Sequence, residues 1–230
     1  MTAFRKNSTF TGVFFILATV FGSICALILN PILGAPDYLA SIAANQNQVV
    51  LGIVLNFAMA LCCAGVGFAL FPVLRKYSEG FAIGAAGFRI IESVLQILGA
   101  IFMVFLLELS REYALAGSPS SSQFQVIGAV IQAGSDWINN SSMLLCWGIA
   151  AILYYSLFYQ YRLIPRWISL WGLIGIALTI IVGILTMFDS KFVSLQFAFA
   201  PIALQEMVMA VWLIVKGFSL PKTKETQLSI

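Results

Sequence analysis

The sequence predicts an all-α integral membrane protein: a bundle of six transmembrane helices with the N-terminus and the C-terminus in the cytoplasm. Of the 230 residues, 61% are hydrophobic and only 9% are charged, and the mean hydropathy is +0.99. A soluble domain carries charge on about a quarter of its residues, so this composition excludes one. Six apolar runs follow one another along the chain, each about 20 residues long and therefore able to cross a bilayer.

The basic residues predict the orientation of the bundle. Of the 12 Lys and Arg residues, nine lie on one side of the six runs, two lie on the other, and Arg89 lies inside a run. Short cytoplasmic loops retain Lys and Arg during insertion, so the side with nine is expected to be cytoplasmic. This retention also accounts for the net charge of +3. The chain has no dense basic run of the kind that binds nucleic acid, so we expect no nucleic-acid partner.

We expect one domain over residues 1–218 and a disordered cytoplasmic tail over 219–230. The first apolar run is longer than the core of a signal peptide and lacks a convincing cleavage site, so it is expected to remain as a span. All four cysteines lie in apolar runs, where they are expected to be free and buried. The six predicted spans are approximately 10–30, 49–74, 81–107, 137–158, 167–188 and 197–215.

The segments between the spans carry several signals. In the exported loop 31–48, Asp37 is expected to cap a short interfacial helix. The stretch 108–136 is expected to be a flexible loop, because a Gly-Ser-Pro sequence and three serines interrupt it. Within that stretch, 124–133 either lies at the interface or prolongs the fourth helix outward, and the sequence leaves both open. Pro165 is expected at or just before the first turn of the fifth helix.

Small residues line one face of the fifth run at spacings of three and four. Helices in lipid lack a hydrophobic drive to associate, so such a stripe is expected to serve close packing, with a ligand groove as the alternative. An inverted three-plus-three repeat of the kind found in some carriers is a further alternative, although the two halves share no convincing sequence echo. The stripe consists of Gly172, Gly175, Thr179, Gly183 and Thr186.

Ionisable and amide side chains inside two of the runs form a candidate site. Arg89, Glu92 and Gln96 are spaced i, i+3 and i+7 in the third run, which places them on one face of a helix. Gln205 and Glu206 lie in the sixth run. With a rise of about 1.5 Å per residue, both glutamates lie roughly 15 Å from the cytoplasmic boundary, near the bilayer midplane. Isolated carboxylates at that depth cost several kcal/mol, so both are expected to face the protein interior.

The expected partner of Arg89 is Glu206. A helical side chain leans toward the N-terminus, so Arg89 is expected to lean away from Glu92 along the same helix. We therefore expect a bridge from Arg89 to Glu206 across a contact between the third and sixth helices. In this hypothesis Glu92, Gln96 and Gln205 complete the polar cluster.

Two interpretations of the cluster remain open. In the first, it binds or translocates a small-molecule or lipid ligand, with carboxylates that carry protons and with Arg89 tuning them or holding an anion. In the second, the protein is structural or binds a partner protein, and the cluster only fixes helix packing. Arg89 would then partly snorkel to cytoplasmic water. The sequence does not determine the oligomeric state.

The residue inventory argues against most enzyme classes. The chain has no histidine, which excludes Ser/His catalysis, H-E-x-x-H zinc sites and histidine-ligated haem. Its three aspartates, Asp37, Asp136 and Asp189, lie at or beyond the exported boundary, which excludes an intramembrane aspartyl protease at the midplane. An acid/base pair of Glu92 and Glu206 is a second alternative, but it lacks a recognisable nucleophile. We therefore expect a non-enzyme with no catalytic residues, metal or cofactor.

Four segments resemble a bacterial membrane family known as domain of unknown function 4386 (DUF4386). The resemblance spans roughly residues 8–218, and its more specific parts are the Arg-Glu segment, the RLIPRW turn and the closing E-x-x-x-x-x-W stretch. It implies a multi-pass protein of the bacterial cytoplasmic (inner) membrane, and it transfers no activity, site residue or cofactor. The segments are DYLASIAAN (37–45), FPVLRKYSEGFAIGAAGFRIIES (71–93), YYSLFYQYRLIPRWISLWGLIG (154–175) and LQEMVMAVWLIVKGF (204–218).

Overall fold

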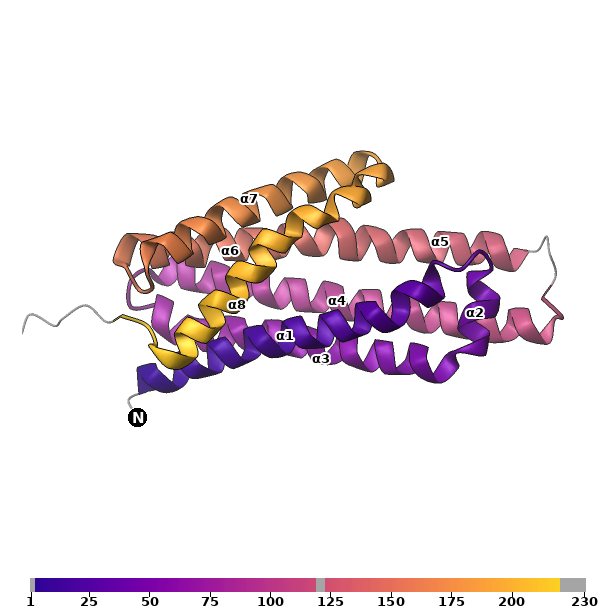
Figure 1. Ribbon diagram of the computed structural model, residues 1–230, viewed down its shortest axis with the longest axis horizontal. Helices are drawn as coiled ribbons and strands as arrows, with labels where there is room; N and C mark the ends of the chain where they lie inside the picture. The colour runs from indigo at the N-terminus through magenta and orange to yellow at the C-terminus, as the bar shows by residue number, and fades with distance from the viewer. Residues whose placement is uncertain (1–2, 119–122, 220–230) are drawn as a thin grey trace, which may run out of the picture.

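Six long helices lie side by side in the protein (Figure 1). The computed structural model describes residues 3–118 and 123–219, and these residues form helices, with no strand among them. Six of the helical segments are long and apolar enough to cross a membrane, which confirms the predicted all-α, six-span architecture. The elements are α1 (Ala3–Leu33), α2 (Tyr38–Ala44), α3 (Gln46–Leu74), α4 (Glu79–Leu115), α5 (Gln123–Trp137), the π-helix η1 (Ile138–Ser142), α6 (Met143–Tyr161), α7 (Arg166–Phe188), the 3₁₀ helix η2 (Ser190–Phe199) and α8 (Ala200–Val215).

The first and last helices meet at one end of the bundle (Figure 1). Arg5 Nη2 donates to the carbonyl oxygens of Ile214, at 2.6 Å, and Val215, at 2.9 Å. The backbone N–H of Phe218 donates to Ser8 Oγ at 2.9 Å. We call this the terminal end and the opposite one the far end. An even number of spans requires the two chain ends to share a side, and the assignment of that side to the cytoplasm stays a prediction.

The helices at the far end are longer than expected, and the prediction of a flexible loop over 108–136 is wrong for most of its length. α4 continues to Leu115 and α5 begins at Gln123. Tyr113 explains the extension, because its buried ring packs against Phe124 with 6.0 Å between ring centroids. Its hydroxyl donates to Asp37 Oδ2 at 3.0 Å, which ties α4 to the start of α2. Residues 119–122 of the expected loop lie outside the described residues.

The structure decides the question that the sequence left open for residues 124–133. α5, η1 and α6 form one continuous helical rod from Gln123 to Tyr161, so this segment prolongs the fourth helix outward. The rod changes to a π-helix at Ile138, directly after Asp136 and Trp137. Single π-helical turns inside α-helices are rare and occur frequently at functional sites.

Several smaller expectations were tested as well. α1 runs through Pro31 to Leu33, so the loop that was expected to begin at residue 31 starts later. The cap at Asp37 is confirmed, since its Oδ1 accepts a hydrogen bond from the N–H of Ala40 at 3.1 Å. Pro165 directly precedes α7, as predicted. The expected disordered tail, apart from its first residue, lies outside the described residues.

The small-residue face of α7 packs against its neighbours. A Cβ atom added to Gly172 would approach the ring of Tyr155 to 2.6 Å, so α6 can lie this close to α7 only because position 172 is a glycine. Gly175 faces Ile202 of α8 in the same way. Toward the far end, α7 and α8 diverge from α5 and stop short of the end that α4 and α5 reach (Figure 1). α7 therefore packs closely against α6 and α8 at Gly172 and Gly175.

Candidate functional site

Four of the five predicted site residues line one cavity inside the bundle, which we call the polar cavity. Its volume is about 260 Å³. α4 contributes Arg89, Glu92 and Gln96, and α8 contributes Glu206. Both glutamates thus face the interior of the bundle, where desolvation makes an unpaired carboxylate costly. Other residues on its walls are Phe15, Thr19, Met59, Cys63, Leu144 and Trp147.

The predicted bridge between Arg89 and Glu206 is wrong. Arg89 Nη1 lies 3.0 Å from Glu92 Oε2, so the ion pair forms within α4, and the part of the chain that the structure describes has no ion pair between Arg89 and Glu206. The reason is that Glu92 also leans toward the N-terminus of α4, which brings its carboxylate back over the turn that carries Arg89. α4 and α8 do not pack along each other but face one another across the polar cavity.

Arg89 is held inside the bundle. Its side chain is 3% exposed, and its Nε donates to the carbonyl oxygen of Cys63 at 3.2 Å. A Cβ atom added to Gly67 would lie 3.0 Å from Arg89 Cβ, so a glycine at this position lets α3 approach the start of the arginine side chain. The guanidinium also lies 5.8 Å from the centroid of the Phe15 ring. These contacts fix the guanidinium beside Glu92.

Gln205 does not belong to the cluster. It is fully buried, its Nε2 donates to the carbonyl oxygen of Ile168 at 2.9 Å, and its Oε1 accepts from the Tyr155 hydroxyl at 2.6 Å. Adjacent residues of an α-helix point about 100° apart, because 3.6 residues make one turn. Gln205 therefore faces α6 and α7, while Glu206 faces the polar cavity.

The polar cavity contains hydrogen-bond acceptors that the protein does not satisfy. Gln96 Oε1 and Glu206 Oε1 are buried and accept no hydrogen bond from another protein group. Glu92 Oε2 is ion-paired with Arg89, but the geometry of this contact is not that of a hydrogen bond. A buried acceptor left in this state costs about 1–3 kcal/mol. In a native structure such an atom calls for an explanation, for example a water, an ion or a ligand.

A second hollow, the middle cavity, continues from the polar cavity toward the far end. Its volume is about 550 Å³, and Gly22, Gln96 and Leu144 are among the residues that line both cavities. Beyond Gln96 its walls are rich in amide side chains. The amides are those of Asn30, Asn56, Asn139 and Asn140, and the polar residues Ser135 and Asp136 line the same cavity.

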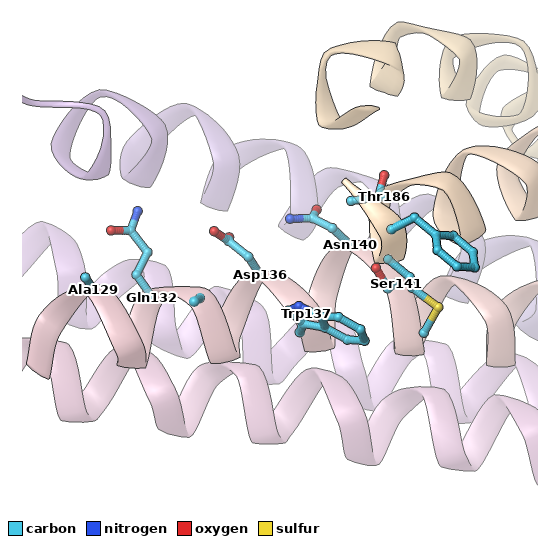
Figure 2. A pocket seen from close by; sticks show the side chains of 10 residues that line it. Ala129, Gln132, Asp136, Trp137, Asn140, Ser141 and Thr186 are labelled. Carbon is cyan, nitrogen blue, oxygen red and sulfur yellow. The ribbon is translucent and has the colours of Figure 1, made fainter. Parts of the chain in front are cut away.

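A third hollow, the outer cavity, joins the middle cavity at Asp136 and Asn140, which line both. Its volume is also about 550 Å³. Figure 2 shows Gln132, Asp136 and Asn140 on one face of the α5–η1 rod, pointing into the same space, with Thr186 of α7 beside it. Asp136 is exposed and forms no ion pair with any residue that the structure describes. Shared lining residues thus place the three cavities next to one another, in the order polar, middle and outer.

Comparison with known proteins gives one result. The family model described as "Domain of unknown function (DUF4386)" matches residues 10–217, which include all the residues that line the polar cavity. The chain belongs to the DUF4386 family. Neither the curated proteins nor the solved structures contain a match. The match confirms the resemblance inferred from four segments, and the DUF4386 protein is a multi-span helical membrane protein.

Sequence reasoning missed several residues that line the three cavities of this DUF4386 protein. Asp136 was read as a boundary marker because the fourth helix was expected to begin there. Trp147 carried a usable signal: tryptophan in a span favours the interfaces, yet this one lies in the middle of its run. Cys63 and Thr19 carried none, because small residues on an apolar helix face usually serve packing. Among the described residues, no group of three or more Cys, Asp or Glu side chains is placed to hold a metal ion.

Proposed function

We propose that this DUF4386 protein is a non-enzymatic protein of the bacterial cytoplasmic membrane that binds or translocates a small or amphiphilic molecule in the polar cavity. One observation carries the proposal. Gln96 and Glu206, deep in a membrane-spanning bundle, line a volume of about 260 Å³ and carry buried acceptors that no protein donor satisfies. A cluster that only fixed helix packing would have its buried acceptors satisfied by protein donors, as Gln205 has.

The walls of the middle cavity support an amphiphilic ligand. Ala26, Leu29 and Leu33 of α1 and Phe199 of η2 contribute apolar walls, and α3, η1 and Gln96 contribute amides. Ligand pockets combine apolar walls with a few convergent polar groups in this way. A polar head at Gln96 and Glu206 would leave an apolar chain to lie along α1.

The first test is equilibrium dialysis of the protein in lipid nanodiscs against labelled dodecylamine, dodecanol and dodecanoate, with empty nanodiscs as the baseline. Saturable binding of at least one probe is expected. Ala26→Phe, which fills the middle cavity from an exposed position, is expected to abolish it. Leu27→Phe is the matched control, because Leu27 is the next residue of α1, is 76% exposed and lines none of the three cavities. Partitioning equal to that of empty nanodiscs for all three probes would contradict the proposal.

A second test separates binding from the structural alternative. Glu206→Gln keeps the shape of the side chain and removes its charge. The proposal expects a folded protein that has lost saturable binding, whereas the structural alternative expects lower thermal stability. Unchanged binding in this variant would reject a role for Glu206 in the site. If an activity is ever detected, turnover abolished by Glu92→Gln or Glu206→Gln would favour the enzyme alternative.

A further inference from the structure

The three neighbouring cavities carry an excess of acidic side chains. Their charged residues are Glu92 and Glu206 in the polar cavity, Asp136 in the middle and outer cavities, and one cation, Arg89. The guanidinium is engaged by Glu92 at 3.0 Å and by the carbonyl oxygen of Cys63 at 3.2 Å. No described basic residue pairs with Glu206 or Asp136. A cavity lined by one sign of charge concentrates ligands of the opposite sign.

Two residues that line the polar cavity, the deepest of the three, carry unsatisfied acceptors. The atoms are Gln96 Oε1 and Glu206 Oε1. An anionic head would place more acceptors against them and would be repelled by the carboxylates. A trimethylammonium head would balance the charge but would offer no N–H. A primary ammonium supplies positive charge together with three N–H donors and no acceptor.

We propose that the ligand of the polar cavity is an amphiphile with a primary ammonium head, which reaches Gln96 and Glu206 from the far end, past Asp136. This inference rests on the proposed function and names its ligand class and its route. Asp136, which lines both the middle and the outer cavity, attracts the ammonium, and Gln96 and Glu206 in the polar cavity bind it.

The test uses four methanethiosulfonates of similar size that differ in their end group: aminoethyl, trimethylammonioethyl, sulfonatoethyl and methyl. In each reaction a cysteine thiolate attacks the thiosulfonate sulfur, a disulfide forms and methanesulfinate leaves. Thr19→Cys reports on the polar cavity, and Leu115→Cys, at an 81% exposed site on α4, reports reactivity in water. Site-resolved mass spectrometry of the protein in nanodiscs measures both rates with the native cysteines retained.

The measured quantity is the rate at position 19 divided by the rate at position 115, which cancels the intrinsic reactivity of each reagent. The ratio is expected to be at least about tenfold higher for the aminoethyl than for the sulfonatoethyl reagent. Asp136→Asn and Glu206→Gln are each expected to reduce this preference. Asp189→Asn is the matched control, because Asp189 is an acidic residue near the far end of α7 that pairs with Lys191 and lines none of the three cavities.

Each other outcome overturns a defined part of the argument. Equal ratios for the cationic and anionic reagents would end the inference and leave the proposed function standing, because the cavity would still be accessible. A trimethylammonioethyl ratio equal to the aminoethyl ratio would reject the primary ammonium and the role of the N–H donors. If none of the four reagents modifies position 19 while position 115 reacts, the cavity is closed and the proposed function fails as well.

Discussion

Two neighbouring residues of α8, Gln205 and Glu206, occupy opposite kinds of environment. Gln205 is fully buried and hydrogen-bonded at both ends of its amide, to Tyr155 and to Ile168. Glu206 faces the polar cavity, and its Oε1 accepts no hydrogen bond from another protein group. The helix therefore separates a satisfied polar contact, which joins α6, α7 and α8, from an unsatisfied one.

The surroundings of the two residues differ in the same way. On the side of Gln205, the rings of Tyr155 and Phe158 lie 6.1 Å apart in a closely packed core. On the side of Glu206, three neighbouring cavities follow one another toward the far end. Membrane proteins use polar side chains both as interhelical contacts and as functional sites. The comparison indicates that hydrogen-bond satisfaction, rather than depth, separates these two uses.

The largest effect on the free energy of unfolding is expected at Arg89. This residue lines the polar cavity, but its guanidinium is held by protein groups, namely Glu92 and the carbonyl oxygen of Cys63. Arg89→Met leaves Glu92 as an unpaired buried carboxylate and should lower the free energy of unfolding by about 3–5 kcal/mol. Reversible unfolding in mixed micelles measures it. The double variant Arg89→Met with Glu92→Met is the control and should recover most of the loss. A single variant as stable as the wild type would show that the ion pair contributes nothing to the fold.

The next effect should appear at Gln205. Gln205→Leu removes both hydrogen bonds and leaves the Tyr155 hydroxyl unsatisfied, so the free energy of unfolding should fall by about 1–3 kcal/mol. The same unfolding assay applies, and Tyr155→Phe should show a smaller loss. Saturable probe binding by the folded Gln205→Leu protein should match that of the wild type. A loss of binding would show that Gln205, like Glu206, contributes to the binding site.

At Glu206 the change in the free energy of unfolding should have the opposite sign. Glu206→Leu removes a desolvated carboxylate whose Oε1 accepts no hydrogen bond from the protein, so the free energy of unfolding should rise by about 0.5–2 kcal/mol while binding is lost. Substitutions at the adjacent positions 205 and 206 are thus expected to change the free energy of unfolding in opposite directions. A Glu206→Leu protein less stable than the wild type would place Glu206 among the structural contacts with Gln205.

The smallest effect on stability should occur at Asp136. Asp136 is exposed and forms no ion pair with the described residues, so Asp136→Asn should change the free energy of unfolding by no more than about 0.5 kcal/mol. Thermal unfolding in nanodiscs checks this. A large loss of stability would mean that Asp136 supports the π-helix η1, and its effect on thiol modification would then need another explanation.

The far end shows why parts of the fold could not be predicted. The glycine at position 117 and the serines after it indicate a loop, and the sequence predicts that this loop begins at residue 108. α4 instead continues to Leu115, because Tyr113 contacts Asp37 and Phe124. Those partners lie far from Tyr113 in sequence or across an interruption, and no local pattern reveals them. Asp37, by contrast, caps α2 through an atom three residues away, and a local rule was sufficient.

The sequence by itself determined the six spans, the cap at Asp37 and the need for Glu92 and Glu206 to turn inward, because these follow from local hydropathy and from the cost of exposing charge to lipid. Only the tertiary structure decided which partner each polar group has. Arg89 pairs within its own helix, Gln205 bonds to α6 and α7, and Glu206 faces the cavity. Hydrogen bonds and ion pairs depend on distances of a few ångströms between side chains, and helix packing, which hydropathy does not encode, sets those distances.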